Sequence, residues 1–263
     1  MRQLVIVILI LIFGNTELYS QTVTADQIEK DLRNSYLKID YHRTITDSIG
    51  SDSVEFANKL LIEKLCRYTS RFPFTMTYSF TSLKKANMII TDSGDKLLRV
   101  YSWDTGRGGT MADYGNVFQY KSGDKIYSKV YYDTIIIGEG EYVPFYSQIF
   151  TMHANNKTYY LAVNNGKYST SDVSQSIKIF TIENSSLNDK VKLIKTQSGL
   201  VNSIDVNFDF FSVVDRPERP LRLIKYDSTK KIIYIPIVYK NGKVTNKFIQ
   251  YKFTGQYFER LKT

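Results

Sequence analysis

The segment from Ser102 to Met111 (SWDTGRGGTM) holds the only tryptophan of the chain together with an aspartate, an arginine and three glycines. Glycine allows positive φ and close approach of other groups, and consecutive amides beside an arginine could hold an anion. The indole could stack on a sugar ring, and the carboxylate could accept a hydrogen bond from a hydroxyl group. We predict a ligand-binding site from these side chains and the two that follow them, namely Trp103, Asp104, Arg107, Asp113 and Tyr114.

The same segment has a second, purely structural interpretation. It could be a hairpin loop in which Trp103 ends a strand inside the core, while Asp104 and Thr105 form hydrogen bonds within the turn. The segment matches neither the phosphate-binding loop nor the dinucleotide fingerprint, because both require a strand, a loop and then a helix. A strand is expected after this loop.

Carboxylates allow an alternative function. Glycosidases use two carboxyl groups about 5–10 Å apart, and acidic residues flank the glycine-rich segment and recur in a second one, GEGE, at 138–141. A hydrolase acting on envelope polysaccharide would use Asp104, Asp113, Glu139 or Glu141. The simpler interpretation of Glu139 and Glu141 is a solvated loop.

The sequence has too few residues of the types that nucleophilic catalysis and metal binding require. The chain has two histidines and one cysteine, too few for a cysteine/histidine zinc site, and a single cysteine cannot form an intramolecular disulfide. No serine lies in a Gly-x-Ser-x-Gly setting. Apolar neighbours predict a buried, inert thiol for Cys66. We therefore predict no catalytic residue, no metal and no cofactor.

Two other polar segments favour structure over chemistry. Asp205, Asn207 and Asp209 resemble the start of a calcium loop, but they alternate with apolar residues and no glycine follows. Strict alternation predicts a solvated face of a strand. The segment 215–220 carries two prolines, and we interpret it as a rigid connection with local ion pairs.

The N-terminus resembles a secretory signal peptide. Ten apolar residues from Leu4 to Phe13 follow a positive start, which is shorter than the about 20 residues of a membrane-spanning helix and typical of a signal peptide. Ser20 predicts cleavage before Gln21. We expect a signal peptide at 1–20, export to the periplasm or beyond the cell, and no transmembrane span after cleavage. An uncleaved anchor is the alternative.

Two helices are expected next. Apolar residues recur at helical spacing over 25–45 and over 53–69. Asp26 is the expected cap of the first helix, and Asp52 with Glu55 resembles a capping box for the second. A proline at position 73 ends the pattern. We predict a helical head, residues 21–73, that packs on the body.

Residues 74–263 form the predicted β-rich body, because short β-branched and aromatic runs alternate with turn residues. Asn165-Gly166 and Asn241-Gly242 are expected hairpin turns, and the absence of helical stretches predicts antiparallel meanders. The expected strands are 74–80, 87–91, 97–103, 115–121, 125–132, 145–152, 157–163, 176–183, 190–197, 204–211, 221–226, 231–238, 245–252 and 255–260.

The strands fall into three groups, 74–132, 145–197 and 204–260, each close to the size of a β-propeller blade. The predicted fold class is mainly β, with an N-terminal helical hairpin and an antiparallel body that is irregular or partly propeller-like. A β-sandwich is the alternative.

The net charge of +9 has a simple origin. The chain is rich in Lys, Asn, Ile and Tyr together, as A/T-rich coding sequences produce, and its lysines are spread out. Nucleic-acid binding usually clusters basic residues on one element, so no nucleic acid is expected as a partner. Attraction to anionic polymers or headgroups is compatible with the charge.

The segment from Ile224 to Phe258 resembles the tails of uncharacterised secreted bacterial proteins. This resemblance implies a bacterial envelope and no particular activity. The sequence thus predicts an exported, non-enzymatic binding or interaction module whose partner is a glycan, an anionic polymer or an envelope protein. It leaves the oligomeric state open.

Overall fold

A computed structural model describes residues 23–45, 48–131 and 143–262. The chain is mainly β, with 44% strand and 24% helix, antiparallel sheets and a helical N-terminal region, as predicted. The expected signal peptide and the carboxylates of Glu139 and Glu141 lie outside the described residues. No helix within the described ranges is long and apolar enough to cross a membrane.

The helices are α1 (Ala25–Arg43), α2 (Ser48–Arg71) and α3 (Thr81–Lys85), with 3-10 turns η1 (Pro73–Met76) and η2 (Phe210–Val213). Thr24 caps α1, where its side chain and that of Gln27 form a reciprocal capping box, so the prediction of Asp26 as the cap was wrong. Asp26 instead accepts a hydrogen bond from the hydroxyl of Tyr78. Helix α2 begins before the predicted start, which places Asp52 inside the helix and not at its cap.

Three sheets follow. The first has the order β1 (Ile89–Asp92), β2 (Leu98–Asp104), β3 (Tyr114–Ser122), β4 (Lys125–Val130). The second has the order β11 (Ser203–Asp209), β7 (Asp172–Glu183), β6 (Lys157–Lys167), β5 (Phe145–Ala154), and β8 (Ser186–Asn188) also pairs with β7. The third has the order β10 (Gly199–Val201), β9 (Ile194–Thr196), β15 (Phe258–Arg260), β14 (Val244–Phe253), β13 (Ile232–Val238), β12 (Lys225–Asp227). The pairings among the described strands are antiparallel except the short parallel contact of β15 with β9.

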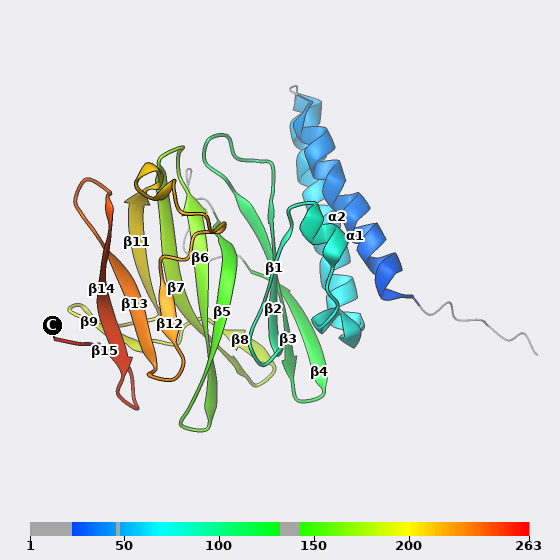
Figure 1. Cartoon of the computed structure of the whole chain (residues 1–263). Coiled ribbons are helices and arrows are strands. Elements are labelled where there is room, and N and C mark those ends of the chain that lie inside the picture. Colours follow the sequence, from blue (N-terminus) through cyan, green and yellow to red (C-terminus); the bar gives the residue numbers. More distant parts are fainter. Residues whose placement is uncertain (1–22, 46–47, 132–142, 263) are drawn as a thin grey trace, which may run out of the picture.

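The helices and the sheets form successive layers (Figure 1), with the helices on one face of the first sheet and the third sheet at the opposite end. Strand β2 shows why the layers hold together. Its alternate side chains Tyr101 and Trp103 join the core under the helices, whereas Leu98 and Val100 join the core shared with the second sheet. Because both faces are covered, every residue from Leu98 to Trp103 is buried.

The strand groups of the sequence correspond closely, but not fully, to the sheets. Strand β11 leaves the third group and pairs with β7, while β9 leaves the second group for the third sheet, where it pairs with β10, a strand outside all three groups. These exchanges join segments distant in sequence, which local patterns do not encode. None of the sheets closes on itself in the part of the chain that the structure describes.

Two local predictions were wrong for identifiable reasons. Residues 74–80 form no strand, because the carbonyls of Thr75 and Tyr78 accept hydrogen bonds from the guanidinium of Arg99 and not from a neighbouring strand. Asn165-Gly166 lies inside β6, where the Asn165 side chain bonds to those of Ser147 and Gln175.

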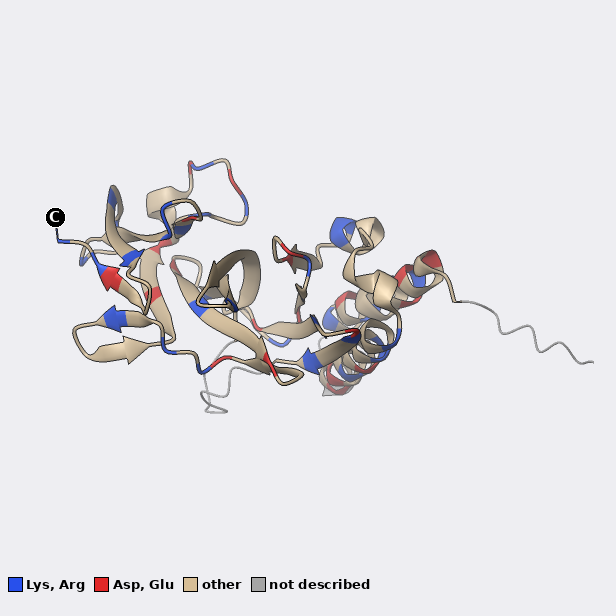
Figure 2. Ribbon diagram, turned by 90° about the horizontal axis from the view of Figure 1, so that it is seen from below, with Lys and Arg blue, Asp and Glu red and all other residues tan. Residues whose placement is uncertain are grey.

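Other local patterns were confirmed. Asn241-Gly242 is the turn between β13 and β14, and Gly242 has a φ of +82°. In β11 the polar Asp205 and Asn207 are exposed, while Val206 and Phe208 are buried, as alternation predicted. Figure 2 shows lysines and arginines scattered over the helices, turns and outer strands, with no single basic face in that view.

Candidate functional site

Trp103 lies in the core and not on the surface. Its side chain is fully buried, and its indole Nε1 donates to Oδ1 of Asn58 on α2 at 2.9 Å. Gly115, its partner on β3, lies so close that a Cβ there would collide with the indole ring. The ring is thus enclosed by the core, where the structural interpretation of the segment places it.

The charged residues of the predicted site form ion pairs within the chain. Arg43 at the end of α1 contacts Asp104 at 3.3 Å. Arg107 reaches Asp113 through Nη2 at 2.7 Å and Glu55 on α2 at 3.2 Å. Burial alone would lower the pKa of Arg107, but the two carboxylates raise it. These pairs connect the loop after β2 to both helices.

Two of the backbone amides that could have held an anion form hydrogen bonds within the loop. The amide of Gly106 donates to Oδ1 of Asp104 at 2.9 Å, and that of Arg107 donates to the hydroxyl of Thr105 at 3.3 Å. Such local bonds are typical of Asx and Ser/Thr turns. An anion bound at these two amides would have to displace those hydrogen bonds.

A cavity of about 400 Å³ lies at this junction, and we call it the helix–sheet cavity. It is lined by Glu55, Asn58, Lys59, Ile62, Glu63, Trp103, Thr105, Arg107, Tyr114, Gly115, Asn116, Val130, Tyr131 and Val143. Of the predicted site residues, Trp103, Arg107 and Tyr114 thus meet at one cavity, Asp113 is bonded to Arg107, and Asp104 faces Arg43 instead. A ligand-binding role for this set stays a prediction.

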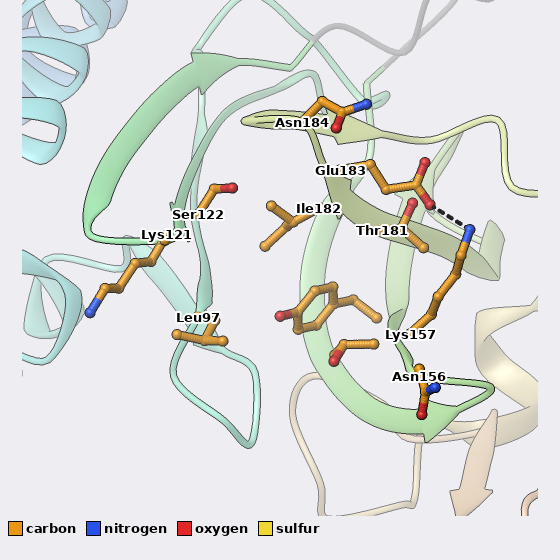
Figure 3. Close-up of a pocket in the computed structure, with 12 residues that line it drawn as sticks. Leu97, Lys121, Ser122, Asn156, Lys157, Thr181, Ile182, Glu183 and Asn184 are labelled. Atoms are coloured by element: carbon orange, nitrogen blue, oxygen red, sulfur yellow. Dashed lines mark hydrogen bonds and ion pairs between the residues drawn. The ribbon is translucent and has the colours of Figure 1, made fainter.

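An open groove of about 580 Å³ lies at the far ends of the first two sheets (Figure 3). The residues lining this polar groove are Leu97, Lys121, Ser122, Gly123, Asn156, Lys157, Thr158, Tyr160, Thr181, Ile182, Glu183 and Asn184. Lys157 pairs with Glu183 at 3.3 Å. The only aromatic residue in the lining, Tyr160, is 1% exposed, and its hydroxyl donates to Asp95. The groove offers polar groups but no aromatic surface for a ring.

The third cavity, of about 350 Å³, has a different lining, and we call it the aromatic pocket. It is lined by Tyr114, Phe145, Asn165, Gly166, Lys167, Thr170, Val173, Ser174, Phe208, Phe210, Phe211, Arg219, Pro220 and Leu221. These residues come from the ends of β3, β5, β6, β7 and β11, from the turn between β6 and β7, from η2 and from the segment that follows η2.

The end of β11 explains how its phenylalanines reach the pocket. Asp209 accepts a hydrogen bond from the amide of Phe211 at 3.0 Å and so starts the 3-10 turn η2. The turn breaks the alternation of the strand, and Phe208, Phe210 and Phe211 all line the pocket. Phe211 is 57% exposed. Across the pocket, the rings of Tyr114 and Phe145 pack 4.8 Å apart.

Two cations border this aromatic lining. Arg219 lies over the ring of Phe210, 5.4 Å from its centroid. It donates to the carbonyls of Arg216, Glu218 and Val214, which uses three of the five N–H groups of a guanidinium. Lys167 is exposed. Among the described residues of this lining none is acidic, and neither cation has an ion pair with a described residue.

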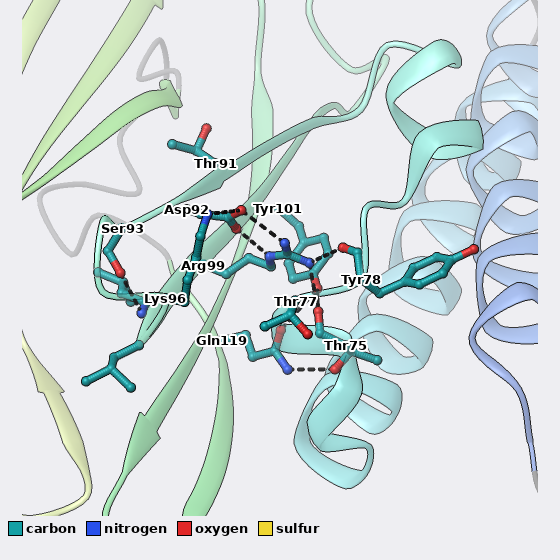
Figure 4. A network of polar contacts seen from close by, with 12 residues as sticks. Thr75, Thr77, Tyr78, Thr91, Asp92, Ser93, Lys96, Arg99, Tyr101 and Gln119 are labelled. Atoms are coloured by element: carbon teal, nitrogen blue, oxygen red, sulfur yellow. Dashed lines mark hydrogen bonds and ion pairs between the residues drawn. The ribbon is translucent and has the colours of Figure 1, made fainter.

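The buried guanidinium of Arg99, in the first sheet, has a structural role. Figure 4 shows Arg99 of β2 bound to Asp92 of β1 and to the carbonyls of Thr75 and Tyr78. Burial alone would raise the pKa of Asp92, but Arg99 lowers it. The network fixes the connection between the helices and the first sheet, and its hydrogen-bonding groups are occupied by one another.

The sequence analysis missed the aromatic pocket. Arg219 and Pro220 were interpreted only as part of a rigid connection, and no ion pair of the described residues holds that segment. The adjacent Phe210 and Phe211, directly after a polar strand face, were the one available signal.

Cys66 is half-buried, and burial raises the pKa of its thiol, as expected for an inert cysteine.

Comparisons with protein-family models, with curated proteins and with solved structures gave no match. In the described ranges, no group of three or more His, Cys, Asp or Glu residues is placed to hold a metal ion. The interpretation of the site therefore depends on its own geometry.

Proposed function

We propose that this protein is an exported, non-enzymatic binding module of a bacterial envelope, and that the aromatic pocket is its ligand site. The observation that carries the proposal is the lining of the pocket. Sites for small molecules are commonly concave, largely apolar and aromatic, with a few polar groups and a volume of roughly 300–1,000 Å³. The aromatic pocket, at about 350 Å³, has this character.

The alternative, a carboxylate-based hydrolase, has no specific observation in its favour. Asp104 and Asp113 are both paired with arginines, so neither is a free base or acid beside a cavity. Glu139 and Glu141 lie outside the described residues.

Binding of a neutral fluorescent probe, N-phenyl-1-naphthylamine, tests the proposal. We expect its fluorescence to rise on binding to the wild-type protein. Thr170, an exposed residue of the pocket lining, is replaced in the variant Thr170→Trp, which places a large ring at the opening and should weaken binding by about tenfold or more. Thr229→Trp, at an exposed turn between β12 and β13, adds the same ring elsewhere and should bind as the wild type does. Equal binding by all three proteins, or none by the wild type, would contradict the proposal.

Export and architecture complete the proposal. Mass spectrometry of the protein from its native host should find a mature N-terminus at Gln21, whereas a mature protein that begins at Met1 would contradict export.

We also infer that the three stacked sheets are a partial propeller-like arrangement, because each sheet packs face to face on the next as blades do. A β-sandwich is the alternative description of two such sheets.

A further inference from the structure

We infer that the ligand of the aromatic pocket is an amphipathic anion, with an apolar chain or ring and one negatively charged head such as a carboxylate. This inference rests on the proposed function of the pocket. It names the class of ligand, which the apolar lining alone does not determine.

The apolar half of the ligand follows from the floor of the pocket. Val173, Phe208 and Leu221 are buried there and belong to one hydrophobic cluster. Phe211 at the rim is 57% exposed, so a ligand lying against it would remove apolar surface from water. An aliphatic chain or an aromatic ring meets both surfaces.

The anionic head follows from the charges around the opening. Lys167 and Arg219 both line the pocket. The guanidinium of Arg219 is held in place by three backbone carbonyls and by its position over Phe210, and two of its N–H groups remain for a ligand. An arginine fixed in this way loses little freedom when it binds a carboxylate.

The linings of the other two cavities differ, because they hold carboxylates beside their cations. Arg107 at the helix–sheet cavity is paired with Asp113 and Glu55, and Lys157 at the polar groove is paired with Glu183. The lining of the aromatic pocket includes no acidic residue among those described. A cationic ligand would meet uncompensated repulsion there, and an anionic one would not.

The class of ligand is tested by competition against N-phenyl-1-naphthylamine. The competing ligands have the same alkyl chain and different head groups. Decanoate, decanol and decylamine are compared at pH 7, below the concentrations at which they form micelles. We expect decanoate to bind about tenfold more tightly than decanol, as a charge-assisted hydrogen bond allows, and decylamine to bind most weakly.

Substitution of the two cations tests whether they cause the preference for decanoate over decanol. Lys167→Gln should reduce the preference for decanoate over decanol about threefold to tenfold, because it removes an exposed cation that has no partner among the described residues. Lys121→Gln, at the polar groove, is the matched control and should not change the preference. Arg219→Gln should reduce it further, and Lys167→Gln keeps the test valid if loss of Arg219 disturbs its loop.

The outcomes separate the two proposals. If the probe binds but decanol competes as well as decanoate, or decylamine competes better, the anionic class is wrong and the pocket remains a binding site. If the preference survives in both Lys167→Gln and Arg219→Gln, the assignment of the head to these cations is wrong. If the probe does not bind the wild-type protein, the proposed function fails, and the anionic class fails with it because it rests on that function.

Discussion

Two cavities meet at Tyr114, which lines both of them, and they differ in how their charges are used. At the helix–sheet cavity the arginine has carboxylate partners, because Arg107 is paired with Asp113 and with Glu55. At the aromatic pocket, Arg219 donates only to neutral carbonyls in the described part of the chain. The first arrangement stabilises the packing of the helices, and the second leaves hydrogen-bonding capacity for a ligand.

This difference shows why an unusual composition did not identify the binding surface. Tryptophan, glycine, aspartate and arginine close together in sequence could serve a ligand or an internal joint. Their partners on α1 and α2 decide between these roles. Charges whose partners are already present contribute to the fold, and unpaired cations beside exposed rings are available for binding.

The largest expected effect concerns Trp103. Trp103→Ala should lower the free energy of unfolding by about 3–5 kcal/mol, the usual loss for a buried tryptophan, since the indole fills the core and bonds to Asn58. Urea unfolding measures it. If the variant loses stability and also binds N-phenyl-1-naphthylamine as wild type does below its unfolding transition, the two cavities have separate roles. A change of less than about 1 kcal/mol would contradict the burial of this residue.

Acid should weaken the helix–sheet side of the molecule. The folded state lowers the pKa of Asp92 below its ordinary value of 3.8, so its contribution to stability is complete above that value and is lost as the pH falls through the folded-state pKa. Asp92→Asn should therefore be less stable than wild type at pH 7, and the gap should narrow toward pH 2.5. Urea unfolding at several pH values measures the gap, and a gap that widens in acid would contradict this assignment.

At the aromatic pocket, binding should change and stability should not. Phe211→Ala should weaken binding of N-phenyl-1-naphthylamine by about tenfold, because the probe loses contact with a ring that is 57% exposed. The free energy of unfolding should change by less than about 1 kcal/mol. Phe56→Ala on α2, where the ring is 69% exposed, is the matched control, and equal loss of binding in both variants would contradict the assignment.

The smallest effect is expected at Asp104. Its ion pair with Arg43 is partly exposed, with 43% and 33% of the side chains accessible, and such pairs contribute about 0–1 kcal/mol. Asp104→Asn should stay within this range and should leave binding of N-phenyl-1-naphthylamine unchanged. A large loss of probe binding in this variant would indicate that the ligand binds at the glycine-rich segment and not in the aromatic pocket.

Patterns that depend on neighbours in sequence were predictable. The alternation in β11, the turn at Gly242 and the end of α2 before Pro73 each depend on a few consecutive residues. Residues 74–80 were wrongly predicted to be a strand, because two of their carbonyls accept hydrogen bonds from Arg99, which is distant in sequence.

The site shows the same limit. The loop around Arg107 was correctly located from composition, but its partner Glu55 comes from α2, 52 positions earlier. The aromatic pocket gathers the ends of five strands, the turn between β6 and β7, the turn η2 and the segment after it, so its residues have no common pattern in the sequence. Only the folded chain brings Lys167, Phe211 and Arg219 to one opening.

The most direct test of the account is a crystal structure of the full mature chain with decanoate. We predict that the chain of the ligand lies against Phe208 and Phe211 and that its carboxylate lies within hydrogen-bonding distance of Arg219 or Lys167. Decanoate bound instead in the helix–sheet cavity beside Arg107, or an empty aromatic pocket at saturating decanoate, would contradict the account.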